Sequence, residues 1–226
     1  NMATPFLKWA GGKTQLLPEL RRLFPIKFRK YYEPFLGGGA VFFDLMPSDF
    51  LISDSNPELI NVYKSIASKP LEVIAKLSCM ENKENFFYEI REKKFESLES
   101  VDAAARTIYL NRTCFNGLYR VNKSGHFNVP FGKYKNPNFI QESRIMECSK
   151  VLRTSKIKCM NFEELRNLNI TKNDFIFFDP PYVPLSGYAD FKRYTKEQFY
   201  MDDQENLADL FKSLAIKGTK LILTNS

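Results

Sequence analysis

The stretch "NDFIFFDPPYVPL", from Asn173 to Leu185, decides how this chain folds. Four apolar residues, Phe175 to Phe178, lead directly into Asp179, and two prolines follow that acid. A short apolar run bounded in this way predicts a buried strand of a parallel sheet, because proline ends both helices and ladder pairing. We expect this strand to lie in the centre of the sheet. Its carboxyl end, where open α/β sheets bind their ligands, would then present the Asp179 carboxylate.

Two stretches nearer the N-terminus predict a ligand site at the same sheet edge. "KYYEPF", from Lys30 to Phe35, predicts a strand that ends before three glycines, and "DFLISD" predicts a strand that ends in Asp54. In doubly wound sheets, a glycine loop after one strand and an acid after the next hold a nucleoside, with the acid on the ribose hydroxyls. Neither the dinucleotide spacing GxGxxG nor a complete phosphate loop at "WAGGKT" is present in the sequence. S-adenosylmethionine therefore fits better than a nicotinamide cofactor or ATP.

The turn that follows the apolar strand combines three chemical groups. Asp179 offers a carboxylate, Pro180 offers a backbone carbonyl, and Tyr182 offers an aromatic face for stacking. Pro180 and Pro181 have no amide donor and stiffen the turn. A planar ring that carries an amino group matches all three groups. The predicted catalytic residues are Asp179, Pro180, Pro181 and Tyr182.

The order of the predicted elements indicates an α/β protein with an insert. Strand, helix and strand alternate at both ends of the chain, where "SKIKCM" and "TKLILTNS" predict further strands. Between them lie a mostly helical region, loops rich in glycine, asparagine and aromatic residues, and a hairpin at "VNKSGHFNV". We expect a catalytic and cofactor-binding domain over residues 1–58 plus 155–226, and an inserted target-recognition domain over residues 59–154.

The distribution of charge points to a polyanionic partner. The formal net charge is +7, and ten basic residues but only two acidic ones lie between Arg112 and Lys158, with aromatic residues interleaved. Such a segment favours nucleic acid. The chain has one histidine and no CxxC spacing, so we expect no metal site. With no apolar run of membrane-spanning length and no signal-peptide pattern, we expect a cytoplasmic protein without a membrane partner.

Five stretches resemble the Dam-like DNA adenine methyltransferases of the α group, which include the DpnII-type modification enzymes. They are "FLKWAGGK", "EPFLGGGAVFFDL", "ISDSNPELIN", "NRTCFNGLYRVNKSGHFNVPFGKYKNP" and "DFIFFDPPYVPL". They cover almost the whole chain in the order of the family. The resemblance implies a Rossmann-like, S-adenosylmethionine-dependent methyltransferase sheet with an inserted, mainly helical target-recognition domain. It also implies further sheet strands after Ser226.

The resemblance implies roles for individual residues and for the partner. The S-adenosylmethionine pocket would contain Trp9, Lys13, Phe35, Gly37, Gly39, Asp54, Asn161, Phe162 and Asp179. The partner would be double-stranded DNA carrying GATC, contacted by Phe115, Asn116, Leu118, Arg120, Pro130, Lys133 and Lys135. Among these, Arg120 would read guanine and Phe115 would wedge into the duplex. A cognate restriction endonuclease would act on the same site without touching this protein.

We hypothesise direct transfer of a methyl group to a flipped-out adenine. Asp179 and the Pro180 carbonyl would accept the two amino hydrogens, which directs the nitrogen lone pair toward the sulfonium methyl. Two alternatives stay open: a cytosine amino methyltransferase with nearly the same site, and a DNA-binding module without enzyme activity. A cytosine carbon-5 methyltransferase is excluded, because its cysteine nucleophile normally follows proline and none does here.

Overall fold

A parallel five-stranded sheet forms one half of the molecule. The computed structural model describes residues 2–181 and 191–224, with the side chains of 191–201 left out. Within this part the strand order is β3-β2-β1-β4-β5, and all four pairings are parallel. The strands are β1 (Tyr31–Glu33), β2 (Phe50–Asp54), β3 (Ile157–Cys159), β4 (Phe175–Phe178) and β5 (Lys220–Leu223). The predicted α/β class, a Rossmann-like parallel sheet, is confirmed.

The apolar run from Phe175 to Phe178 forms β4, and both of its faces are buried. Its side chains alternate, so that Phe175 and Phe177 enter one core cluster while Ile176 and Phe178 enter another. β4 lies between β1 and β5, so β1 and not β4 occupies the middle of the described sheet. The expectation of a central β4 was wrong by one place. An apolar run shows that a strand is covered on both faces, but it does not give the order of neighbours.

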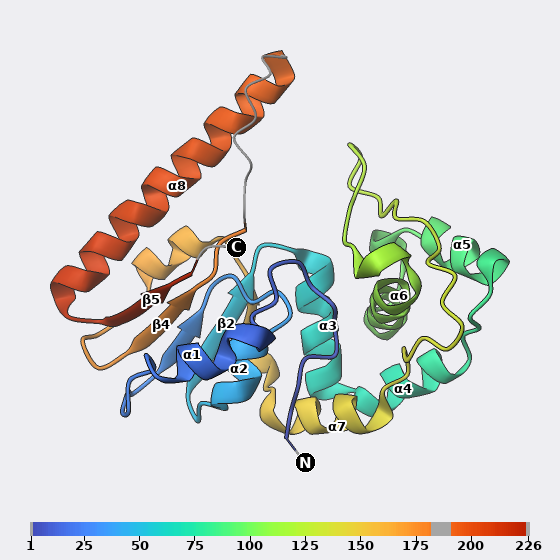
Figure 1. Cartoon of the computed structure of the whole chain (residues 1–226), viewed down its shortest axis with the longest axis horizontal. Coiled ribbons are helices and arrows are strands. Elements are labelled where there is room, and N and C mark those ends of the chain that lie inside the picture. Colours follow the sequence, from blue (N-terminus) through green and yellow to red (C-terminus); the bar gives the residue numbers. More distant parts are fainter. Residues whose placement is uncertain (1, 182–190, 225–226) are drawn as a thin grey trace.

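Helices cover both faces of the sheet (Figure 1). The first core cluster joins the sheet to α1 (Leu17–Arg21), α2 (Ala40–Leu45) and α3 (Pro57–Ser68). The second joins the opposite face to η5 (Phe162–Asn167) and α8 (Phe191–Lys217). This is a doubly wound arrangement, in which crossover connections on the two faces return each strand to the same direction.

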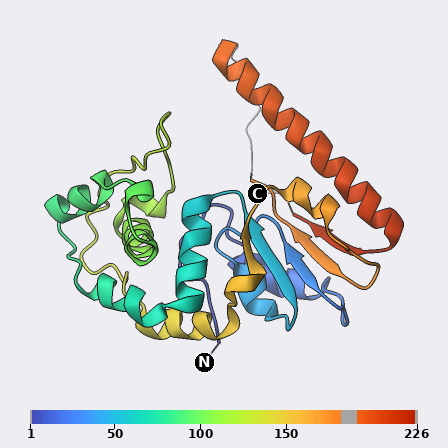
Figure 2. The ribbon, with the colours of Figure 1, turned by 180° about the vertical axis from the view of Figure 1, so that it is seen from behind.

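The other half of the molecule is mainly helical (Figures 1 and 2). Its helices are α4 (Pro70–Ser78), α5 (Glu84–Glu92), α6 (Ser100–Thr113) and α7 (Glu142–Val151). Two short 3-10 turns, η2 (Phe95–Ser97) and η3 (Phe115–Gly117), also belong to this half. Two others lie elsewhere in the chain: η1 (Thr14–Leu16) precedes α1, and η4 (Thr154–Lys156) precedes β3. α6 is buried along most of its length because it packs against α3, α4 and α5.

Helix α3 connects the two halves, and local sequence sets where it starts. The Asn56 side chain accepts hydrogen bonds from the backbone nitrogens of Glu58 and Leu59, and Pro57 occupies the first helical position. Both views show α3 between the sheet and the helical half (Figures 1 and 2). One core cluster contains Phe50 of β2, Tyr63 of α3 and residues of α6, so apolar packing runs without a break from the sheet into the helical half.

Residues 114–141 contain little regular structure. Two isolated antiparallel bridges, Cys114 with Phe131 and Val121 with Phe127, close this segment on itself. The predicted hairpin at residues 121–129 is confirmed in short form, with Asn122 N donating to His126 O at 2.8 Å. In the described parts of the chain, no helix is both long and apolar enough to cross a membrane.

Candidate active site and recognition loop

Three neighbouring strands end in acids at one edge of the sheet. β1 ends in Glu33, β2 ends in Asp54, and Asp179 directly follows β4. Because these strands are parallel neighbours, their carboxyl ends meet where the strand order reverses between β1 and β4. This is the position at which doubly wound sheets bind ligands. Among the side chains of residues 2–181 and 202–224, no group of three or more His, Cys, Asp or Glu is arranged to hold a metal ion.

Asp54 ties the end of β2 to the glycine loop after β1. Its Oδ2 accepts a hydrogen bond from Gly37 N at 3.1 Å, and its Oδ1 accepts one from Asn56 N at 3.1 Å. Burial raises the pKa of the Asp54 carboxyl, while the backbone N–H groups of Gly37 and Asn56 lower it. A largely buried carboxylate in this position is suited to accept hydrogen bonds from ligand hydroxyls.

The glycine loop adopts a backbone conformation that glycine favours. Gly37 and Gly39 have φ values of 51° and 74°, and Gly39 caps the start of α2. A Cβ on Gly37 would lie 2.8 Å from Trp9 Cδ1, so the indole packs directly on the loop. Tyr63 donates a hydrogen bond from its hydroxyl to Gly37 O at 2.7 Å and holds the loop from the side of α3.

An aromatic pair lies beside the glycine loop. The rings of Phe35, after β1, and Phe162, after β3, have centroids 5.4 Å apart. Phe162 is buried, whereas Asn161 is exposed and its side chain accepts a hydrogen bond from Glu163 N at 2.9 Å. The structure thus brings Trp9, Phe35, Gly37, Gly39, Asp54 and Phe162 to one sheet edge, with Asn161 beside Phe162.

Lys13 reaches the Asp179 carboxylate from the N-terminal segment. Lys13 Nζ lies 3.3 Å from Asp179 Oδ1, and the Thr224 hydroxyl donates to the same oxygen at 2.9 Å. The Lys13 side chain is only 7% exposed, so this ion pair is shielded from water. Both contacts fix the orientation of the carboxylate at the end of β4. Pro180 is half-buried and Pro181 exposed, while Tyr182 lies outside the described residues.

The predicted DNA contacts gather on the loop after α6. Phe115 and Leu118 are 49% and 44% exposed, so this loop presents two large apolar side chains to solvent. Asn116 has a φ of 53°, and its backbone nitrogen donates to the Tyr134 hydroxyl at 2.9 Å. Pro130 O accepts a hydrogen bond from Phe115 N at 2.9 Å, which closes the loop.

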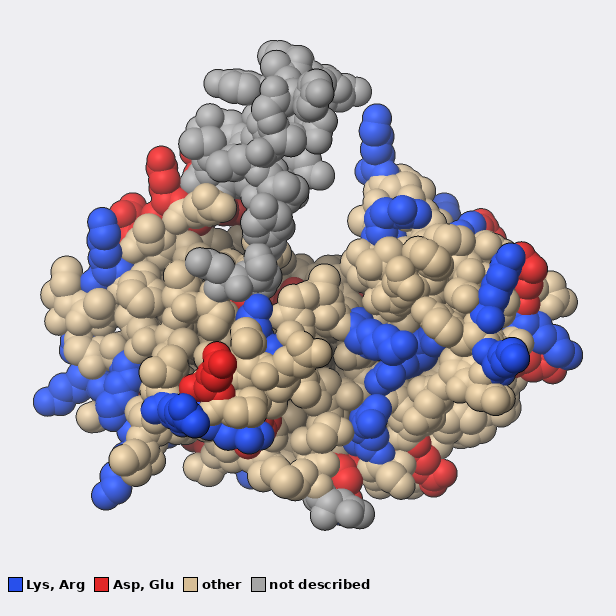
Figure 3. All heavy atoms as spheres, viewed as in Figure 1, with Lys and Arg blue, Asp and Glu red and all other residues tan. Residues whose placement is uncertain are grey.

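The charged members of this set are exposed. Arg120 Nε donates to Asn128 Oδ1 at 2.8 Å across the hairpin, and Lys133 and Lys135 lie on the returning segment. Figure 3 shows Lys and Arg side chains on the half of the molecule that carries the hairpin, including the hairpin tip. This arrangement of exposed cations around exposed apolar side chains is typical of a nucleic-acid interface.

Sequence reasoning missed three residues that the structure brings to these sites. Glu33 had the signal that identified Asp54 and Asp179, an acid at a strand end. Thr224 follows β5 and reaches the carboxylate of the neighbouring strand. Lys8 had no such signal: its side chain lies over the Tyr134 ring and its backbone pairs with the Asn111 side chain, 103 residues away.

Comparison with known proteins gives consistent matches along the chain. The family model described as D12 class N6 adenine-specific DNA methyltransferase matches residues 9–226. The chain is 42% identical to the type II methyltransferase M1.LlaDCHI of Lactococcus lactis subsp. cremoris, over 98% of this chain and 81% of that protein. It is 41% identical to the type II methyltransferase M.MjaIII of Methanocaldococcus jannaschii, over 98% and 84%. It is 36% identical to a DNA adenine methylase of Vibrio cholerae, over 97% and 80%.

These matches decide between the alternatives that the sequence left open. They favour neither a cytosine amino methyltransferase nor a DNA-binding module without enzyme activity, and they confirm the resemblance to Dam-like enzymes. The chain belongs to the D12 class of N6 adenine-specific DNA methyltransferases.

Proposed function

We propose that this enzyme takes its methyl group from S-adenosylmethionine and methylates the adenine of GATC in double-stranded DNA. The donor would supply an electrophilic methyl group on a sulfonium. The residues at the sheet edge fit such a ligand: the half-buried Asp54 carboxylate is suited to ribose hydroxyls, and the Phe35–Phe162 pair offers apolar surface for a purine ring. Trp9, Gly37 and Gly39 would form the wall nearest the donor.

The observation that carries the proposal is the position of the Asp179 carboxylate, which Lys13 contacts at the end of β4. Only β1 separates β4 from β2, the strand whose Asp54 accepts a hydrogen bond from Gly37 N. We propose that this carboxylate and the Pro180 carbonyl accept the two hydrogens of the adenine amino group. The nitrogen lone pair, otherwise delocalised into the ring, is then directed toward the methyl group. Lys13 and Thr224 keep the carboxylate in place, so that positioning and electrostatics lower the barrier.

The target adenine must leave the duplex to reach this edge, which costs a few kcal/mol. Pro181 and Tyr182 would complete the pocket that receives it. Exposed Phe115 would fill the space left in the duplex, and Arg120 would read guanine. The remaining predicted contacts are Asn116, Leu118 and Pro130 on bases, and Lys133 and Lys135 on phosphates.

We assign residues 1–58 plus 155–226 to catalysis and cofactor binding, and residues 59–154 to target recognition. In support, all strands of the described sheet fall in the first part and all proposed DNA contacts fall in the second. Two of the similar proteins are named type II methyltransferases. A cognate restriction endonuclease that cuts the same site without contacting this enzyme is therefore part of the proposal, as is activity in the cytoplasm.

A plasmid protection experiment tests the donor and the sequence together. The purified protein is incubated with plasmid and S-adenosylmethionine, and the plasmid is then digested with endonucleases that sense adenine methylation in GATC. We expect protection only when the donor is present, and far less protection by Asp179→Asn over the same incubation. Methyl incorporation without protection at GATC would contradict the proposed sequence. Absence of S-adenosylmethionine binding in calorimetry would contradict the proposed donor.

A further inference from the structure

Tyr119 lies at the junction of the proposed cofactor edge and the hairpin that carries Arg120. Its ring stacks on Trp9, with centroids 5.1 Å apart and planes 30° apart, and it also contacts Phe127 across the hairpin. Trp9 in turn packs on Gly37. Direct contacts therefore lead from the glycine loop to Trp9 and from Trp9 to Tyr119, which directly precedes Arg120 in the chain.

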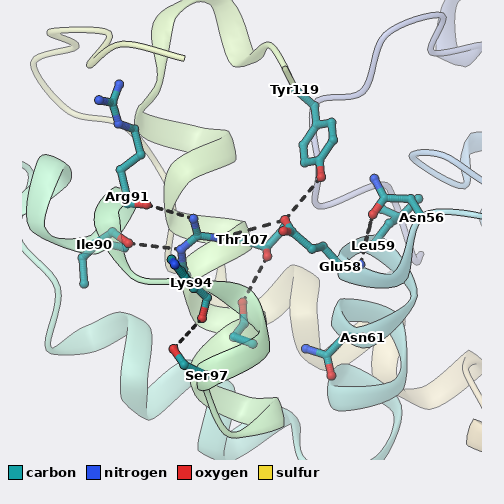
Figure 4. Close-up of polar contacts among 12 residues, drawn as sticks. Asn56, Glu58, Leu59, Asn61, Ile90, Arg91, Lys94, Ser97, Thr107 and Tyr119 are labelled. Atoms are coloured by element: carbon teal, nitrogen blue, oxygen red, sulfur yellow. Dashed lines mark hydrogen bonds and ion pairs between the residues drawn. The ribbon is translucent and has the colours of Figure 1, made fainter. Parts of the chain in front are cut away.

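A second chain of contacts reaches Tyr119 through its hydroxyl. The hydroxyl donates to Glu58 Oε2 at 3.3 Å, as Figure 4 shows, with Asn56 beside it. Asn56 accepts from Glu58 N at 3.0 Å through its side chain, and donates from its own backbone nitrogen to Asp54 Oδ1 at 3.1 Å. Glu58 therefore links Asp54, the predicted ribose-binding acid, to Tyr119 of the hairpin through hydrogen bonds that pass by Asn56.

Glu58 is buried beside an arginine. It is only 8% exposed, and Arg106 Nη1 lies 4.0 Å from the Oε2 atom that accepts the hydrogen bond from Tyr119. Arg106 is held by the carbonyl oxygens of Ile90 and Arg91 at the end of α5. Trp9, Glu58, Arg106 and Tyr119 also line one small cavity of about 10 Å³, so the four side chains lie close together.

We propose that Tyr119 and Glu58 are positioning residues that couple cofactor binding to the placement of the recognition hairpin. This inference rests on the proposed function, in which the sheet edge binds the cofactor and the hairpin reads DNA. A cofactor on the Asp54–Gly37 edge would fix Trp9 and the start of α3. These contacts would fix Tyr119, and the DNA-reading conformation of Arg120 would then be more populated.

The test measures affinity for a duplex with one GATC site, with and without saturating S-adenosylhomocysteine, which carries no methyl group to transfer. For the wild-type protein we expect tighter DNA binding with the cofactor product present. Tyr119→Phe keeps the ring stack but removes the hydroxyl, and Glu58→Gln removes the charged acceptor. Each should reduce the gain in DNA affinity about tenfold, the ratio that corresponds to ~1.4 kcal/mol. DNA affinity without cofactor should change less than about twofold.

Tyr88→Phe is the matched control. Tyr88 lies on α5, and its hydroxyl accepts from Phe131 N at 3.3 Å, so this variant loses a similar contact in the recognition region. A merely structural role of Tyr119 would weaken DNA binding equally with and without cofactor. The coupling is refuted if Tyr119→Phe and Glu58→Gln keep the wild-type gain, or if Tyr88→Phe reduces it as much. Failure of the wild-type protein to bind S-adenosylhomocysteine would instead overturn the proposed function.

Discussion

Replacing Glu33 by glutamine should abolish a large pH dependence of stability. Glu33 ends β1, is 2% exposed, and lies beside β2 and β4, whose ends carry Asp54 and Asp179. The pKa of the Glu33 carboxyl is raised to about 8: burial is the largest cause, the Asp179 and Asp54 charges add to it, and hydrogen bonds from the Tyr31 hydroxyl and Phe42 N–H act in the opposite direction. At neutral pH the folded protein therefore keeps this carboxyl mostly protonated.

The sign and size follow from proton linkage. The ordinary pKa of the carboxyl is 4.5 and the value in the folded protein is about 8, so the folded state binds the proton more tightly than the unfolded state. The stabilising contribution is complete below pH ~4.5 and is lost as the pH rises to ~8. Within this window the loss approaches ~1.4 kcal/mol per pH unit, and in total it is on the order of 5 kcal/mol.

Urea unfolding of wild-type protein and Glu33→Gln between pH 5 and pH 9 measures this term. Fluorescence of Trp9, the single tryptophan, reports the transition. We expect the variant to gain stability relative to wild type as the pH rises, because glutamine cannot ionise. Glu19→Gln, the same change at an exposed side chain of α1, is the control. A difference between wild type and Glu33→Gln that stays flat across the range would refute the reasoning.

Three further substitutions test the proposed site. Asp179→Asn should lower methyl transfer to GATC by ~10²- to 10³-fold, the usual effect of losing one preorganised polar group, while calorimetry shows S-adenosylmethionine still bound. Arg120→Ala should reduce discrimination between GATC and single-base variants by ~1–3 kcal/mol in competition binding, with unchanged cofactor affinity. Gly37→Ala should lower the free energy of unfolding by ~1–2 kcal/mol because of the φ of 51°, and by a further amount because the added carbon must displace Trp9. Gly125 is also at positive φ, but the added carbon would have no atom within 4 Å. Urea unfolding of Gly125→Ala should therefore show only the ~1–2 kcal/mol loss that comes from φ.

The parts of the fold that the sequence predicted depend on local signals. β2 is an apolar run closed by Asp54, and β4 is one closed by Asp179 and two prolines, so both ends could be located within a residue. Parallel strands then bring their carboxyl ends to one edge, whatever their order. For this reason Asp54 and Asp179 could be predicted to lie at one edge without knowledge of the neighbours of β4.

The contacts that sequence reasoning missed depend on packing between distant segments. The Lys13–Asp179 ion pair and the Lys8–Asn111 hydrogen bonds join the N-terminal segment to β4 and α6. No local pattern encodes such a pair, because its two partners lie far apart in the chain. The raised pKa of Glu33 also could not be predicted from the sequence, because it results from burial and from the charges of Asp54 and Asp179 at the ends of neighbouring strands.

The placement of α6 limits which part of the recognition region is able to move. Arg112 at the end of α6 donates to Phe6 O at 3.0 Å, and Asn111 pairs with the backbone of Lys8, so this helix is fixed to the N-terminal segment. The shared core through α3 fixes it to the sheet as well. A rotation of the whole helical half would break these contacts. We therefore expect any adjustment to DNA to occur within residues 115–131, where few ladder hydrogen bonds exist and where Glu58 holds Tyr119.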